Sequence, residues 1–380
     1  MMESSLLHSC NFNTMSFLHT LLLTLPSFFH PGTQAVAIDT PYQSVNVDYY
    51  NADSTIHFGA TLTMPHTRKP CPAVVLLSGT GKQDRDGTMA GHKMFLVIAD
   101  YLSRNGIAVL RVDDRGVGAT SGKYEDATTA DFANDALTGL HWLMAHKGIN
   151  PHKTGLIGHS EGGAAAYIAA AESRDVAFII SLAGLATPGL QALKKQNEMI
   201  VNTAPISEQK KYRYNSVNEV MFDTVYAYAQ SPTLETHMRN AYKIWQTADS
   251  AYMVAHPQDP SDKGRFFFPM ESYVMMATGP WYRYHIRFDP APFLEKVEVP
   301  FLAINGERDI MVDATSSLAY ITQHTTDNKN VTTLKAPGLN HLFQHCTTCT
   351  NSEPSQLKED FAPEVLQTIS EWIKKNTGTH

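Results

Sequence analysis

The chain has 380 residues, of which 43% are hydrophobic and 10% aromatic, and a formal net charge of −7 at pH 7. This length and composition fit a folded protein with a sizeable core and exclude a disordered chain. Because the sequence has no basic run or stripe, we expect no nucleic-acid partner.

Residues 15–29, MSFLHTLLLTLPSFF, are apolar, contain Pro26 and are followed by the small-residue stretch TQAVA at 33–37. This is the outline of a secretory signal, although the first basic residue is Arg68 and the usual positive start is missing. The apolar run is too short and interrupted for a stable membrane span. We therefore predict that residues 1–37 are a signal peptide and that the protein is exported to the periplasm or secreted. If the segment is only a disordered tail, the protein is cytoplasmic.

Strand and helix patterns alternate along the first part of the chain. An alternating pattern predicts a β-hairpin at 44–51 and 56–65. The elements that follow are predicted as strands at 72–79, 107–116, 153–160 and 176–184, and as helices at 92–106, 129–146 and 161–173. This order predicts an α/β fold with a mostly parallel central sheet and helices on both faces.

The alternation stops between residues 187 and 290, which are polar, aromatic and rich in methionine. The helical patterns lie at 207–230 and 234–248, and strand–helix order resumes with 299–309, 316–324, 331–341 and 362–376. We therefore predict an α/β core in two parts, 38–186 and 291–380, with a helical cap inserted at 187–290.

Large apolar side chains of the cap have two interpretations. They would either line an apolar substrate pocket or pack the cap against the sheet. For any single one of these residues we favour packing. They are Tyr226, Trp245, Phe266, Phe267, Met275, Trp281 and Tyr282.

The segment GLIGHSEGG, residues 155–163, contains the pattern G-x-S-x-G. The pattern alone is weak evidence, but here a predicted strand precedes Ser160 and a predicted helix of small residues follows it. That context is required for a sharp turn that presents a nucleophilic serine, and Gly158 and Gly162 leave the turn free of side chains. We predict that Ser160 is the nucleophile.

A serine hydroxyl needs a base, and the base needs a carboxylate to orient it. Asp309 ends a predicted strand and is the candidate carboxylate, with Glu307 and Asp313 as nearby rivals. The alternative is that Asp309 is a surface turn residue.

The candidate base is His341, one of 17 histidines. It directly follows the last predicted strand and the turn-forming residues Gly338 and Asn340, whereas its main competitor, His345, lies four residues further on. We therefore predict His341 as the general base.

Backbone N–H groups are the expected donors to the oxyanion. One is Glu161, directly after the nucleophile, and the other is Thr80, in the glycine-containing segment SGTGKQDRDG at 78–87. The glycines there could also form a plain turn.

The glycine-rich segment DDRGVGATSG at 113–122 has neither of the common phosphate-binding spacings, so we interpret it as a structural turn. Asp114 and Arg115 are expected to tie loops near the floor of the site. Residues 84–86 either do the same or form its rim.

Cys346 and Cys349 form a C-x-x-C pattern that would be a local disulfide in an exported protein or two reduced cysteines. A zinc site would need two more ligands, and only His341 and His345 are near. Because His341 already has a predicted role, we expect no metal, and the chemistry implies no organic cofactor.

Taken together, these segments resemble the bacterial EstD-type carboxylesterases of the α/β-hydrolase superfamily. The residues that carry the resemblance are 78–87, 92–120, 128–137, 158–163, 305–309 and 337–346. The resemblance implies an esterase acting on small-molecule acyl esters with a Ser–Asp–His triad, which falls here on Ser160, Asp309 and His341 in the chain order expected of the superfamily. The Cys-x-x-Cys spacing has no counterpart that we can place in the family pattern.

Other functions share the same pattern. A small peptidase or aminopeptidase uses the same triad, although the chain has no room for the β-propeller of prolyl-oligopeptidase-like enzymes. A thioesterase or lactonase would have a nearly identical sequence. A non-catalytic binder with this fold would normally lack a triad member, and none is missing here. The sequence indicates neither the oligomeric state nor the physiological ester.

Overall fold

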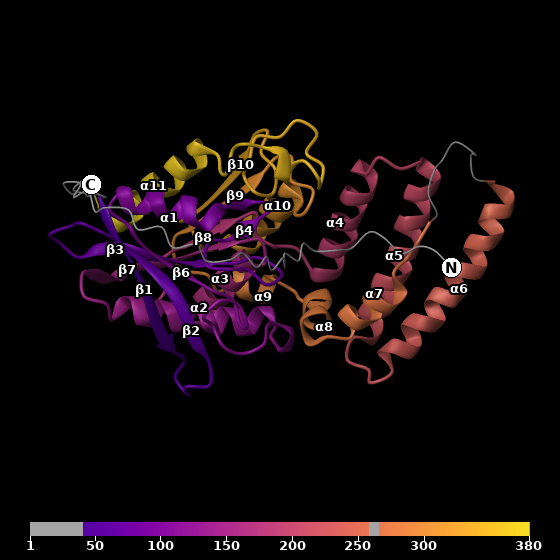
Figure 1. Cartoon of the computed structure of the whole chain (residues 1–380), viewed down its shortest axis with the longest axis horizontal. Coiled ribbons are helices and arrows are strands. Elements are labelled where there is room, and N and C mark those ends of the chain that lie inside the picture. Colours follow the sequence, from indigo (N-terminus) through magenta and orange to yellow (C-terminus); the bar gives the residue numbers. More distant parts are fainter. Residues whose placement is uncertain (1–40, 258–265, 380) are drawn as a thin grey trace, which may run out of the picture. The chain divides into compact units, whose positions relative to one another are not determined.

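A single large sheet lies at the centre of the part of the chain that the computed structural model describes, residues 41–257 and 266–379. Its strands are β1 (Tyr42–Tyr50), β2 (His57–Pro65), β3 (Cys71–Leu77), β6 (Ala108–Val112), β7 (Ile149–His159), β8 (Ile179–Leu182), β9 (Phe301–Gly306) and β10 (Val331–Ala336). Their order across the sheet is β1-β2-β6-β3-β7-β8-β9-β10. β1 pairs antiparallel with β2, and β2 with β6, whereas the remaining neighbours are parallel. The predicted hairpin and mostly parallel sheet are thus confirmed (Figure 1).

Helices cover both faces of the sheet because alternate strand residues point to opposite sides. Val74 of β3 belongs to a cluster with the helices of one face, and Val75 to a cluster with those of the other. The first face carries α1 (Met94–Arg104) and α11 (Pro363–Thr377), and the second carries α2 (Thr129–Met144), α3 (Glu161–Glu172) and α10 (Ala314–His324). Between β3 and α1 the chain forms a small two-stranded ribbon, β4 (Thr88–Met89) and β5 (His92–Lys93).

Several predicted boundaries differ from the observed ones. The strand predicted at 331–341 ends at Ala336, because Pro337 has no N–H to pair and Gly338 adopts a positive φ of 70°. The strand predicted at 153–160 begins earlier, at Ile149, which pairs with Cys71 before an irregular step in the ladder. The predicted signal segment, 1–37, lies outside the described residues.

The described parts of the inserted segment contain helices and connecting loops. Its helices are α4 (Gly189–Thr203), α5 (Glu208–Tyr228), α6 (Leu234–Ala255), α7 (Met270–Ala277) and α8 (Pro280–Arg287), and no strand occurs in 187–257 or 266–290. The short helix α9 (Ala291–Leu294) then leads back to β9. No helix in the described ranges is long and apolar enough to cross a membrane.

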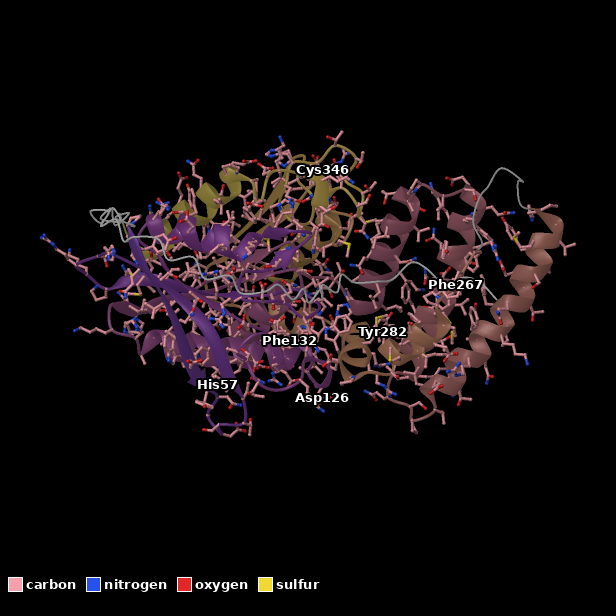
Figure 2. The ribbon with its side chains drawn as sticks, viewed as in Figure 1. His57, Asp126, Phe132, Phe267, Tyr282 and Cys346 are labelled. Carbon is pink, nitrogen blue, oxygen red and sulfur yellow. A yellow bond between two sulfur atoms is a disulfide. The ribbon has the colours of Figure 1, made fainter. Side chains whose placement is uncertain are left out.

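The cap has a hydrophobic core of its own, formed by residues of α5 to α8. Trp245 and Tyr282 are buried in it, which fits the packing interpretation of these two side chains. Figure 2 labels Phe267 and Tyr282, both of which belong to the cap. Phe267 and Met275 are 69% and 74% exposed. The large apolar side chains of the cap therefore do not form one pocket wall.

A buried aspartate connects the loop after β3 to the loop after β6. The Asp113 carboxylate accepts hydrogen bonds from the backbone N–H and the guanidinium of Arg85, at 2.8 and 2.5 Å, and from the backbone N–H of Ala119 at 3.1 Å. Asp113 is 4% exposed, so removal of its charge would leave the Arg85 guanidinium without its main partner.

We expect Asp113→Ala to lower the free energy of unfolding by about 3 kcal/mol, because it leaves a charged group and two backbone donors unpaired. Urea unfolding followed by circular dichroism measures the change. Asp126→Ala, at an exposed position, is the control and should change stability by less than about 0.5 kcal/mol. Equal effects of the two substitutions would contradict a structural role for Asp113.

Candidate active site

The turn between β7 and α3 consists of one residue, Ser160. Its φ of 54° and ψ of −119° lie outside the regions that residues with side chains normally adopt. Neighbouring glycines permit the turn: a Cβ on Gly158 would lie 1.9 Å from the carbonyl oxygen of Gly162, and a Cβ on Gly162 would lie 2.3 Å from that of Leu77. The backbone therefore holds the Ser160 hydroxyl at the carboxyl edge of the sheet.

The loops after β9 and β10 bring Asp309 and His341 together. Asp309 Oδ2 lies 2.8 Å from His341 Nδ1, and Oδ1 accepts hydrogen bonds from the backbone N–H groups of Met311 and Val312 at 2.7 and 2.9 Å. The Asp309 side chain is fully buried, whereas that of His341 is 15% exposed. A carboxylate in this position holds the proton on Nδ1 and leaves Nε2 as the basic nitrogen.

The rival residues make other contacts. Glu307 accepts the backbone N–H of Gly338, and Asp313 caps α10 through the N–H of Ser316 at 2.8 Å. His345 pairs with Glu359 and Glu364 and its side chain is 57% exposed.

Ser160 and His341 face one cavity of about 310 Å³. The other lining residues are Gly79, Thr80, Gln83, Met89, His159, Leu185, Ala192, Leu193, Gln196, Trp281, His285 and Met311. None of the lining residues in the described chain is Lys, Arg, Asp or Glu. Of the cap residues singled out in the sequence, Trp281 alone is in this lining set. The cavity is thus lined by apolar residues and by a similar number of uncharged polar residues and histidines.

His159 anchors the loop that carries His341. Its Nε2 donates to the backbone carbonyl oxygen of His341 at 3.0 Å, and the two rings lie 4.6 Å apart. Burial, together with the nearby His341, lowers the pKa of His159 to about 3, so it remains neutral at neutral pH. The sequence did not predict this contact, because the only notable sequence feature of His159 is that it directly precedes Ser160.

Glu161 connects the turn to the loop after β3 and to the cap. Its buried carboxylate accepts hydrogen bonds from the Thr80 hydroxyl at 2.9 Å, the Thr129 hydroxyl at 2.6 Å and the Trp281 indole N–H at 2.6 Å. Burial raises the pKa of Glu161 above its ordinary value, while the three donors act in the opposite direction. Thr80 is thereby held beside the residue that follows Ser160.

Asp114 lies behind this group. It accepts the Ser78 hydroxyl and, at 2.8 Å, the backbone N–H of Gln83, as expected for a residue that ties loops together. Burial raises the pKa of Asp114 to about 7. Arg115 instead forms a bidentate ion pair with Asp135, at 2.6 and 2.8 Å.

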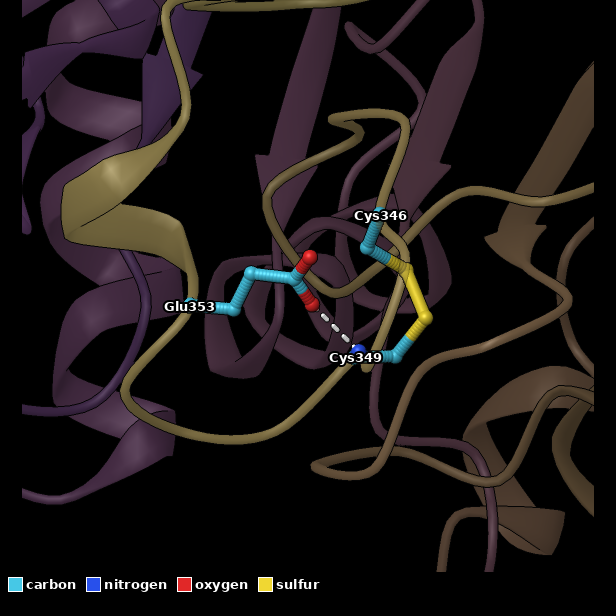
Figure 3. A group of neighbouring side chains, drawn as sticks. All are labelled: Cys346, Cys349 and Glu353. Carbon is cyan, nitrogen blue, oxygen red and sulfur yellow. Dashed lines mark hydrogen bonds between the residues drawn. A yellow bond between two sulfur atoms is a disulfide. The ribbon is translucent and has the colours of Figure 1, made fainter.

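Cys346 and Cys349 form a disulfide in the segment that follows His341 (Figure 3). Glu353 lies beside them, and the three residues are close enough to hold a cation. The sulfur atoms are bonded to each other, however, and the Glu353 carboxylate already accepts backbone N–H groups of Thr347, Thr348 and Cys349. The disulfide therefore cross-links this segment locally, and the three residues do not offer a set of free metal ligands.

Comparison with known proteins now identifies the family. A family model described as the alpha/beta hydrolase fold matches residues 72–345, so the chain belongs to the α/β-hydrolase family. The chain is similar to Esterase EstD of Thermotoga maritima, with 25% identity over 319 residues that make up 83% of this chain and 65% of that protein. It therefore spans about 65% of the length of this relative, and the predicted resemblance to EstD is confirmed.

Solved structures show the same fold. The α/β hydrolase GrgF from Penicillium sp. sh18 aligns with a TM-score of 0.53 and 15% identity, over 88% of this chain and 99% of GrgF. An esterase from Pyrococcus furiosus aligns with a TM-score of 0.52 and 15% identity, over 89% of this chain and 92% of the esterase.

We expect Glu161→Ala to lower the free energy of unfolding by about 3 kcal/mol, because three donors lose their acceptor. Glu161→Gln should cost clearly less, since the amide oxygen can still accept from Trp281 and the amide nitrogen can donate to a threonine hydroxyl. Urea unfolding of the two variants and the wild type tests this order. If Ala is tolerated as well as Gln, the carboxylate does not connect the three segments.

The raised pKa of Asp114 predicts a pH-dependent stability. A carboxyl whose pKa is higher in the folded than in the unfolded state stabilises fully below its unfolded value, and that contribution is lost as pH rises towards about 7. Relative to Asp114→Asn, the wild type should therefore lose roughly 2 kcal/mol of unfolding free energy between about pH 5 and pH 8. Urea unfolding of both proteins at the two pH values measures this difference, and a constant difference would contradict the burial of an ionisable group.

Proposed function

We propose that this protein hydrolyses carboxylic esters through an acyl-enzyme on Ser160, with His341 as general base and acid and Asp309 as its orienting carboxylate. The observation that carries the proposal is the hydrogen bond from His341 Nδ1 to the Asp309 carboxylate, because His341 lines the same cavity as Ser160, the strained turn residue. The likeness to Esterase EstD supports ester hydrolysis as the reaction class.

In this mechanism His341 Nε2 takes the proton of the Ser160 hydroxyl while the oxygen attacks the ester carbonyl carbon. The imidazolium that forms is stabilised by Asp309, which is buried and held by two backbone donors. His341 then protonates the leaving alcohol. Water, activated by the same imidazole, attacks the acyl-enzyme and releases the acid.

The backbone N–H groups of Thr80 and Glu161 are the proposed donors to the oxyanion. The hydrogen bond from the Thr80 hydroxyl to the Glu161 carboxylate holds these two residues side by side, and a Cβ on Gly79 would lie 3.0 Å from Cβ of Ser160. Donors held in advance stabilise developing charge without rearranging, and each is typically worth a factor of about 10² to 10³ in rate.

The same acyl-enzyme mechanism also applies to thioesters, lactones and peptides. Turnover of a thioester or an amide that exceeds that of the matched ester would reassign the substrate class while leaving the roles of the three residues intact.

We expect Ser160→Ala to lower kcat on p-nitrophenyl butyrate by at least about 10³-fold, because the covalent route is lost. The variant should also fail to react with a fluorophosphonate probe, whose adduct mass spectrometry places on the wild-type Ser160. Ser250→Ala, on an exposed face of the cap, is the matched control and should retain both activities. If Ser160→Ala keeps near-normal turnover, or the wild type takes no probe, the proposal is wrong.

A further inference from the structure

Two buried polar side chains in the active-site cavity have unused hydrogen-bonding capacity. Gln83, in the loop after β3, is 7% exposed, and His285, on α8 of the cap, is 5% exposed. Both line the cavity that contains Ser160 and His341. Within the described chain, the Gln83 side-chain oxygen has no partner, and neither ring nitrogen of His285 forms a hydrogen bond.

Four of the six other polar side chains in the cavity wall form hydrogen bonds, whereas Gln196 and the Ser160 hydroxyl form none among the described residues. The Thr80 hydroxyl and the Trp281 indole N–H both donate to Glu161. His159 donates to the backbone of His341, and His341 is hydrogen-bonded to Asp309. His159 is buried more deeply and its Nδ1 has no partner in the described ranges, but its Nε2 is already bonded. Among the wall side chains that form no hydrogen bond in the described chain, Gln83 and His285 are the most deeply buried.

Both side chains are attached to rigid backbone. The Gln83 N–H donates to Asp114 Oδ2 at 2.8 Å, and its carbonyl accepts the Asp114 N–H at 3.2 Å. The ring of His285 stacks on Trp281, with centroids 4.7 Å apart and planes at 10°. The first residue of α4, Gly189, packs so closely that a Cβ there would lie 1.7 Å from the His285 carbonyl oxygen. Groups held in this way are arranged before a ligand binds.

The chemistry of the two groups restricts what they can recognise. Burial lowers the pKa of His285 to about 4, so its ring is neutral at neutral pH and offers one donor and one acceptor. The Gln83 amide likewise offers both. A charged substituent would find no charged side chain among the described residues of the wall, whereas an alkyl substituent would leave the two groups without partners once it displaces water.

We infer that the substrate is an ester that carries an uncharged hydroxyl group in its acyl or alcohol part, and that Gln83 and His285 bind that group. The inference rests on the proposed esterase function and names the substrate class for the same site. The apolar residues of the wall, such as Leu193 and Met311, would contact the rest of the substrate.

A paired ester panel tests the inference. The acyl arm compares p-nitrophenyl 3-hydroxybutyrate with p-nitrophenyl butyrate, and the alcohol arm compares 3-hydroxybutyl butyrate with butyl butyrate. Each kcat/KM is divided by the rate at which hydroxide alone cleaves that ester, which removes differences in intrinsic reactivity. We expect the wild type to prefer the hydroxylated ester by about tenfold or more in at least one arm, because sites built around a hydrogen-bonding group reject analogues that lack it.

Two variants assign the preference to these residues. Gln83→Met keeps the length of the side chain, and His285→Phe keeps the ring that stacks on Trp281, but each removes the polar atoms. Each should bring the ratio between the paired esters towards one, and this ratio is independent of a general loss of activity. Gln191→Met, on an exposed part of α4 outside the cavity wall, is the matched control and should leave the ratio unchanged.

Equal corrected rates in both arms for the wild type would overturn the inference, as would a preference that persists in both variants. These results differ from a failure of the esterase function, in which the wild type cleaves none of the four esters and takes no fluorophosphonate. That failure would overturn the proposed function and this inference together.

Discussion

The positive φ of Ser160 is the constraint on which the site depends. It is tolerated because Gly158 and Gly162 let α3 approach the sheet to a distance that no side chain would permit. The turn points three consecutive residues in different directions. His159 reaches the loop of His341, Ser160 faces the cavity, and Glu161 reaches Thr80 and the cap. One local distortion thus sets the position of the hydroxyl and of its surroundings.

Buried carboxyl groups surround the cavity without facing it. Asp309 and Glu161 are almost fully buried and Asp114 is partly buried, and each accepts from a different set of donors. Asp309 accepts from two backbone donors and lies beside an imidazole, whereas Glu161 accepts from two hydroxyls and an indole N–H. Burial raises the pKa of Glu161 although these donors act in the opposite direction. Such groups are costly to bury and therefore fix the loops that satisfy them. The wall that meets a substrate contains no Lys, Arg, Asp or Glu among the described residues.

The core and the cap contribute different parts of the site. The chemistry proposed for Ser160 comes from loops at the carboxyl ends of parallel strands, where open α/β sheets place their ligands. The cap is stabilised by its own hydrophobic core, and through Trp281 and His285 it supplies part of the cavity wall. Because Trp281 also donates to Glu161, the wall of the cap is tied to the residue after the nucleophile. A change in the cap can therefore affect both recognition and the alignment of the turn.

The sequence alone determined the alternation of strands and helices, the helical insertion and the turn at Ser160, because hydrophobic period and glycine spacing are local properties. It also proposed Asp309 and His341, whose positions at strand ends follow from the order of elements. Strand ends such as Ala336 were missed by a few residues, since proline and glycine stop pairing where a hydrophobic pattern continues. Only the tertiary structure decided that Gln83 and His285 face the cavity and that His159 holds the His341 loop. The bond between His159 and His341 joins residues 182 positions apart, and no local sequence pattern encodes such long-range proximity.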